Sequence, residues 1–119
     1  MDPKELGKKG EAIAMKRLLK AGYKIHQQNY VYLKAEIDIV AEQNHRIVFV
    51  EVKTRQSAYL SDPALLVPIS KQKQIIRAAD QYMKDHFPER ESRFDIMVVI
   101  TNSGYTSVEH IVDAFYPMV

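Results

Sequence analysis

The 119-residue sequence contains no cysteine. Disulfide bonds, thiolate zinc sites and cysteine nucleophiles are therefore excluded. The four histidines, at positions 26, 45, 86 and 110, are not paired at the spacing of a zinc site, so no zinc centre is expected. No segment reaches the roughly 20 apolar residues of a membrane-spanning helix, and the N-terminus lacks the apolar region of a signal peptide. These absences predict a cytoplasmic protein with no membrane partner.

The sequence also has no internal repeats, low-complexity segments or linkers, and its length suits one hydrophobic core. We therefore expect a single domain spanning residues 1–119. The net charge is only +2, but residues 1–25 carry seven Lys or Arg against three acids, and residues 53–77 carry five against one, so each segment has a balance of +4. If the two segments meet in the fold, they can follow a phosphate backbone. The alternative is two ordinary solvated helix faces.

Charged residues interrupt the apolar stretch at 34–55, KAEIDIVAEQNHRIVFVEVKTR. Side chains alternate over residues 36–42 and again over 47–53, which indicates two strands. Asn44 and His45 between them suit a tight hairpin turn. With these two turn residues, the register forms an apolar face from the pairs Ile37–Val52, Ile39–Val50 and Ala41–Val48.

On the second face, the same register places Asp38 opposite Glu51 and Glu36 opposite Lys53. Directly opposed residues have Cβ atoms roughly 4.5–5.5 Å apart, so the carboxylates of Asp38 and Glu51 repel each other unless a cation lies between them. Carboxylate oxygens are the ligands that Mg²⁺ and Mn²⁺ prefer. The pattern leaves an alternative open, in which Asp38, Glu51 and Lys53 simply pair with each other on a solvated sheet face.

Two helices are predicted around this hairpin, at residues 4–21 and 70–87. The first ends before Gly22, and the second begins with Ser70 as its N-cap. The apolar stripe expected on the second helix consists of Ile75, Ile76, Ala79, Met83 and Phe87. Its first turn also carries candidate phosphate contacts, because free backbone N–H groups there favour anions. These contacts are Lys71, Gln72 and Lys73.

Further strands are expected at 23–32, 93–101 and 108–112, and the second of these is nearly all apolar, as in a strand covered on both faces. Asp95 within it is expected to pair with Arg93 or another basic residue. The predicted order is αβββαββ, an α/β (α+β) fold with a mixed central sheet flanked by helices. Residues 56–68 hold two prolines and no clear period, which fits either a functional loop or, over 59–67, a subunit contact.

The order of these elements, with Asp38 on the second strand and Glu51-x-Lys53 on the third, resembles the PD-(D/E)xK nuclease superfamily, also called restriction endonuclease-like. More closely, the chain resembles the YraN family of small bacterial proteins, which are distantly similar to archaeal Holliday junction resolvases. The matching segments span most of the chain. They are GKKGEAIA at 7–14, GYKIHQQNY at 22–30, EIDIVA at 36–41, VFVEVKTR at 48–55, KQ at 71–72 and RFD at 93–95.

This resemblance implies one nuclease-like domain that hydrolyses phosphodiester bonds with Mg²⁺ or Mn²⁺. Asp38 and Glu51 would bind the metal, and the Val52 carbonyl and Glu11 would be further ligands. Lys53 would assist the attacking water or stabilise the charge that develops on the phosphate. The expected partner is DNA rather than RNA, with branched and single-stranded DNA among the expected substrates.

The resemblance also implies nucleic-acid contacts at Arg55 and Gln72, beside Lys71 and Lys73. One residue departs from the family pattern: Ala35 stands where a glycine is common, and it would strain or narrow the site if that glycine has a positive φ. Fold membership alone does not establish cleavage, so a nucleic-acid-binding module of the same fold stays open as the alternative. An interaction protein with purely structural carboxylates and a homodimer are also open.

Overall fold

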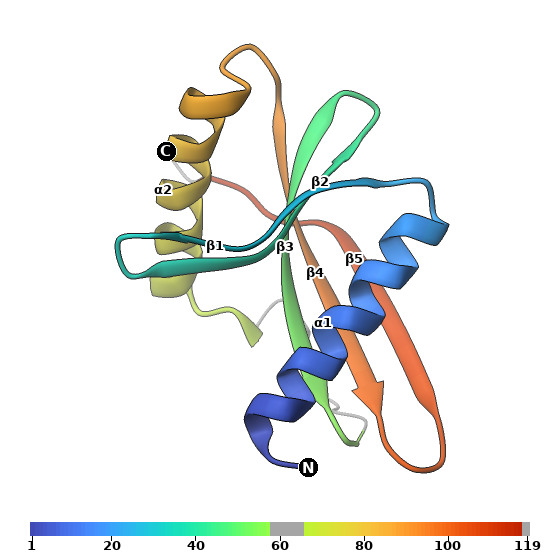
Figure 1. Ribbon diagram of the computed structural model, residues 1–119. Helices are drawn as coiled ribbons and strands as arrows, with labels where there is room; N and C mark the ends of the chain where they lie inside the picture. Colours follow the sequence, from blue (N-terminus) through green and yellow to red (C-terminus); the bar gives the residue numbers. More distant parts are fainter. Residues whose placement is uncertain (58–65, 118–119) are drawn as a thin grey trace.

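The computed structural model describes residues 1–57 and 66–117. Its two helices lie on opposite faces of one five-stranded sheet, with strand order β1-β2-β3-β4-β5 (Figure 1). The predicted mixed α+β fold and its αβββαββ order are confirmed. Residues 59–65 of the predicted subunit contact lie outside the described residues. The elements are α1 (Pro3–Lys20), β1 (Lys24–Tyr32), β2 (Ala35–Gln43), β3 (Arg46–Arg55), α2 (Ile69–His86), β4 (Ser92–Thr101) and β5 (Thr106–Phe115).

All neighbouring strands are antiparallel except β3 and β4, which are parallel. Parallel neighbours need a crossover connection, and the segment containing α2 provides it. The β2–β3 hairpin turns at Asn44 and His45, whose φ angles are 51° and 67°. Two left-handed residues give a turn whose twist matches that of the strands. The predicted turn is therefore confirmed, together with the pairs Ile39–Val50 and Ala41–Val48.

Toward the open end of this hairpin, the predicted register is wrong. The β2–β3 ladder ends at Ile39 and Val50, so it contains neither an Ile37–Val52 pair nor a pairing of Asp38 with Glu51 or of Glu36 with Lys53. Asp38 Oδ2 instead accepts a hydrogen bond from the Val52 backbone N–H at 2.8 Å. The alternation also breaks here, because Ile37 packs in the cluster beneath α2 whereas Ile39 packs beneath α1. A side-chain bond to the backbone replaces the ladder at Asp38.

Helix α1 begins where Asp2 caps it, with Asp2 Oδ1 accepting the Glu5 backbone N–H at 2.8 Å. It ends before Gly22, whose φ of 90° few residues other than glycine adopt readily. Within the helix, Gly10 is buried against β3, and a Cβ at this position would overlap the Thr54 side chain. The missing side chain lets α1 lie directly on β3.

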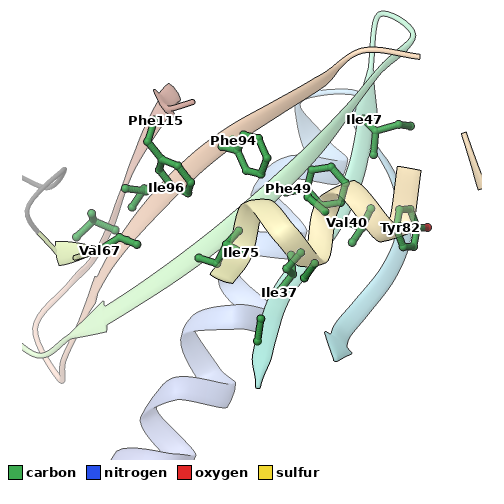
Figure 2. Close-up of a cluster of buried hydrophobic side chains, with 14 residues drawn as sticks. Ile37, Val40, Ile47, Phe49, Val67, Ile75, Tyr82, Phe94, Ile96 and Phe115 are labelled. Atoms are coloured by element: carbon green, nitrogen blue, oxygen red, sulfur yellow. The ribbon is translucent and has the colours of Figure 1, made fainter. Parts of the chain in front are cut away.

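Helix α2 begins at Ile69 with Pro68 in the N-cap position, so the predicted Ser70 N-cap is wrong. Proline fixes the extended backbone that leads into the helix, and Ser70 lies inside the first turn. The buried face includes Tyr82, which the predicted stripe omits. Tyr82 packs edge-on against Phe49, with ring centroids 5.8 Å apart. Figure 2 shows the resulting cluster, in which side chains of β2, β3, β4 and β5 meet α2.

Strand β4 is buried on both faces, as predicted: Ile96 packs beneath α2 and Met97 beneath α1. The predicted pairing of Asp95 is also confirmed. Arg93 donates from Nε to Asp95 Oδ1 at 2.9 Å and from Nη2 to Asp95 Oδ2 at 2.7 Å. In the described part of the chain, no helix is long and apolar enough to cross a membrane.

Candidate active site

Glu51 projects from β3 and is almost fully buried, with 5% of its surface exposed. Its Oε2 atom has no hydrogen-bond partner within residues 1–57 and 66–117. The cation paired with it is Lys71 of α2, whose Nζ lies 3.4 Å away. A buried carboxylate oxygen without a hydrogen bond carries a cost in free energy, so its presence needs an explanation beyond packing.

Asp38 lies at the point where β2 leaves β3, close to Glu51. Burial, followed by the interaction with Glu51, raises the pKa of Asp38 to about 8, and the Val52 N–H bond only partly offsets this. Two carboxylates thus share a small, poorly solvated space. An added cation at this position would relieve their repulsion.

Glu11 reaches this region from α1 because Gly10 brings the helix onto β3. Burial raises the pKa of Glu11, and the charges of Asp38 and Glu36 raise it further. Asn29 of β1 holds Glu11: with its amide oriented to donate, Asn29 Nδ2 lies 3.0 Å from Glu11 Oε1 and 3.1 Å from Glu36 Oε1. These bonds orient Glu11 at the border of the site.

Sequence reasoning missed Asn29. Its φ is 52°, and the β1–β2 ladder pairs Gln28 with Ile39 and Tyr30 with Ile37 but leaves Asn29 and Asp38 between them unpaired. The signal in the sequence is an asparagine in mid-strand, a residue that tolerates the left-handed region better than most.

Two lysines accompany the carboxylates. Burial and the nearby ammonium of Lys71 lower the pKa of Lys53. For Lys71 burial is the largest influence and acts in the same direction, but the charges of Glu51 and Asp38 and the contact with Lys53 together outweigh it, so the pKa of Lys71 is raised. The sequence predicted a nucleic-acid contact at Lys71, and the structure adds its ion pair with Glu51.

A cleft of about 350 Å³ between α1, the open end of the hairpin and the start of α2 brings most of the predicted site residues together. Arg55 lines it too, and its Nη1 donates to the Thr54 carbonyl at 2.9 Å. The predicted residues that line this cleft are Glu11, Asp38, Glu51, Val52, Lys53, Arg55 and Lys71.

Two predicted contacts lie elsewhere. Gln72 and Lys73 line a different cavity, of about 450 Å³, together with Tyr116. The Gln72 side chain donates from Nε2 to the Val67 carbonyl at 2.8 Å, which ties the first turn of α2 to the preceding segment. Ala35 does not have a positive φ, so it introduces no strain of the kind considered above, and it is buried on the wall of a cavity beside the carboxylates.

The donor set fits a hard divalent cation with few protein ligands. Among the residues that the structure describes, no three Asp, Glu or His side chains are arranged to hold one ion. Asp38 and Glu51 would therefore supply two carboxylates, with Val52 beside them in the cleft. Mg²⁺ is commonly held by one or two carboxylates, with waters and substrate phosphates completing its octahedral shell. The Oε2 atom of Glu51, which has no hydrogen bond among the described residues, agrees with such a ligand role.

The sequence matches known proteins over almost its whole length. Residues 10–99 match a family described as "Uncharacterised protein family UPF0102". A UPF0102 protein of Christiangramia forsetii is 39% identical over 112 residues, which cover 94% of each chain. A UPF0102 protein of Bacteroides thetaiotaomicron is 42% identical over 113 residues, which cover 95% of this chain and 93% of the relative. The family match extends from α1 to β4 and so includes both carboxylates and both lysines.

Proposed function

This chain belongs to the UPF0102 (YraN) family, and we propose that it is a metal-dependent nuclease that hydrolyses phosphodiester bonds in DNA. One observation carries the proposal. The buried Glu51 carboxylate, one oxygen of which lacks a hydrogen bond from any residue that the structure describes, lies beside a second carboxylate and two lysines in an open cleft. A purely structural cluster would also hydrogen-bond that oxygen, because buried polar groups are usually hydrogen-bonded.

The proposed roles follow from the position of each residue in the cleft. Asp38 and Glu51 would hold Mg²⁺ or Mn²⁺ on two neighbouring strands of a rigid sheet, with Val52 and Glu11 at its border. When bound, such an ion lowers the pKa of water and offsets charge on the scissile phosphate. Lys53 follows Glu51 by two residues on β3 and lines the same cleft.

The pKa of Lys53 is lower than that of an ordinary surface lysine, which makes Lys53 better suited to general acid–base catalysis. Lys53 would take a proton from the attacking water or stabilise the charge on the phosphate oxygens. Arg55 and Lys71 add positive charge along the same cleft and would contact neighbouring phosphates.

A second candidate function is a nucleic-acid-binding module of the same fold with little or no cleavage. The Lys71–Glu51 ion pair favours it, because an ammonium near Glu51 competes with a metal. Both candidates predict salt-sensitive DNA binding, and they differ only in metal-dependent hydrolysis.

The test compares cleavage and binding in one set of proteins. Purified wild type is incubated with Mg²⁺ or Mn²⁺ and labelled duplex, single-stranded, flap and four-way junction DNA. Asp38→Ala, Glu51→Ala and Lys53→Ala are tested in parallel, with Glu89→Ala, an exposed acid outside the cleft, as the matched control. We expect wild type and control to cleave and the three variants to lose roughly 10³-fold or more, because each removes several kcal/mol of transition-state stabilisation.

Salt-sensitive binding of DNA should persist in all three variants. Binding by wild type without cleavage of any substrate would support the second candidate instead. Absence of both DNA binding and metal uptake would overturn both and favour an interaction protein. The homodimer stays a prediction, and light scattering of the same samples measures it.

A further inference from the structure

Another cavity, distinct from the cleft, lies on the far side of the carboxylates from α1. It has a volume of about 430 Å³ and is formed by the β1–β2 turn and the middle of α2, which lie side by side in Figure 1. We call it the hairpin cavity, after the hairpin of β1 and β2. Its lining residues are Tyr32, Leu33, Lys34, Ala35, Gln74 and Arg77.

Shared lining residues connect the hairpin cavity to the candidate active site. A smaller cavity of about 280 Å³ lies between the two and shares Lys34 and Gln74 with the hairpin cavity. It shares Asp38, Glu51 and Lys71 with the cleft. A chain molecule bound at the carboxylates therefore has a lined path to the hairpin cavity.

The side chains of the hairpin cavity suit a nucleotide. Lys34 and Arg77 are exposed and form no ion pair with any described residue, so their charges are available to phosphates. Tyr32 contributes an aromatic ring and Gln74 an exposed amide. An aromatic or apolar surface for the base, with cations for the backbone, is the usual combination for binding single strands.

Leu33 is unusual in two independent respects. It is 70% exposed, although it is large and apolar, and its φ of 55° lies in the left-handed region. Glycine or asparagine would adopt this conformation at a lower cost in free energy than leucine does. Neither burial nor turn geometry accounts for leucine at this position. An apolar surface that meets a base does account for it.

We propose that the hairpin cavity binds an unpaired nucleotide of a DNA strand whose neighbouring phosphodiester lies at Asp38 and Glu51. This inference rests on the proposed nuclease function and names its substrate class, DNA with unpaired nucleotides at a branch or in a single strand. Arg77 and Lys34 contact the phosphates, and the base packs against Leu33. A base inside an intact duplex is stacked and paired and does not enter such a cavity.

The test measures binding without metal, so that hydrolysis does not interfere. Fluorescein-labelled oligo(dT), a forked duplex and a blunt duplex are titrated with the protein in EDTA at several salt concentrations, and anisotropy gives each Kd. The variants are Arg77→Ala and Leu33→Asn, which keeps a residue suited to positive φ. Lys84→Ala on the same helix and Val31→Thr on the same hairpin are matched controls, since both are exposed and neither lines the hairpin cavity.

We expect Arg77→Ala and Leu33→Asn each to weaken binding of oligo(dT) and of the fork by about 5- to 100-fold, with less than about twofold change for the blunt duplex. For oligo(dT), Arg77→Ala should also make the slope of log binding constant against log salt concentration shallower by about 0.7. Both controls should bind as wild type does. Thermal melting checks that the variants are folded.

The outcomes separate this inference from the function on which it rests. If wild type binds and cleaves DNA but both variants bind every DNA as wild type does, the inference is overturned and the nuclease proposal stands. Equal weakening on all three DNAs would overturn the assignment to an unpaired nucleotide. Failure of wild type to bind any DNA would overturn both.

Discussion

Two buried carboxylate regions of the same sheet differ in how their charges are satisfied. Asp95 on β4 is completely buried. It accepts two hydrogen bonds from Arg93 and one from the Asp113 backbone N–H at 3.0 Å, and one of its oxygens lies 2.7 Å from His110 Nε2. Burial alone would raise the pKa of Asp95, but the hydrogen bonds with His110, Arg93 and the Asp113 N–H and the charge of Arg93 together outweigh it, so the pKa is lowered. At the other region the Oε2 atom of Glu51 has an ion pair with Lys71 but no hydrogen bond among the described residues.

The difference shows that burial alone does not decide what a carboxylate does; its partners do. Around Asp95 the fold supplies a guanidinium, a ring nitrogen and a backbone N–H, and the group is held in its charged form. Around Asp38 it supplies one backbone N–H and a second carboxylate, and the pKa rises to about 8. The first arrangement stabilises the sheet, whereas the second retains unsatisfied charge that a ligand can use.

The largest loss of stability is expected from a substitution in the Asp95 region. Asp95→Ala leaves the Arg93 guanidinium buried without its partner, so the free energy of unfolding should fall by about 3–5 kcal/mol, measured by urea denaturation. Asp80→Ala removes an exposed acid from an ion pair with Lys84 and is the control, with a change of about 0.5 kcal/mol or less. A fall below about 1 kcal/mol for Asp95→Ala would mean that this network does not anchor β4. His110→Ala is a milder variant if Asp95→Ala does not fold.

The second prediction concerns pH and has opposite signs in the two regions. The folded pKa of Asp38, about 8, lies above its usual 3.8, so without metal its contribution to stability is fully present below pH 3.8 and lost as the pH rises toward 8. Asp95 has a lowered pKa, so its contribution is present above pH 3.8 and lost as the pH falls through the folded value.

Urea denaturation in EDTA between pH 5 and pH 8 measures the Asp38 contribution. Asp38→Asn keeps an oxygen for the Val52 N–H but does not titrate. The free energy of unfolding of wild type should therefore fall with rising pH more steeply than that of Asp38→Asn, by on the order of 1 kcal/mol per pH unit. The same slope in wild type and in Asp38→Asn would contradict the prediction.

The smallest effect is expected at Lys71, which partly satisfies Glu51. Lys71→Met removes an ammonium 3.4 Å from Glu51 Oε2 and keeps most of the side-chain volume, so Mn²⁺ should bind about three- to tenfold more tightly, by calorimetric titration. Lys84→Met, on the same helix and paired with Asp80, should leave the Mn²⁺ affinity unchanged. Weaker binding in Lys71→Met would mean that Lys71 orients Glu51 for the metal rather than competing with it.

Sequence reasoning was most successful where local patterns carry the information. Asn44 and His45 predicted the hairpin turn because few residue pairs adopt two left-handed conformations readily. The apolar run of β4 predicted a strand covered on both faces, and Asp95 within it was correctly expected to pair with Arg93. The cleft also brings Asp38, Glu51 and Lys53 together.

Sequence reasoning failed where distant elements meet. It continued the β2–β3 ladder past Ile39, because nothing local signals that Asp38 accepts the Val52 N–H. It missed Asn29, whose contacts with Glu11 and Glu36 join β1, α1 and β2. It also gave no sign that Lys73 lines a different cavity from Lys71, and the predicted phosphate contact at Lys73 stays a prediction.

The sequence by itself determined the order of elements, the hairpin turn and the presence of two acids and a lysine in neighbouring strands, because periodicity and turn chemistry act over a few residues. The tertiary structure alone decided which charges are satisfied. It gave Asp95 its donors and opened the hairpin cavity, and within residues 1–57 and 66–117 it left Glu51 Oε2 with the Lys71 ion pair but no hydrogen bond. These outcomes depend on ångström-scale distances between helices and strands far apart in the chain, and packing of the whole fold sets those distances.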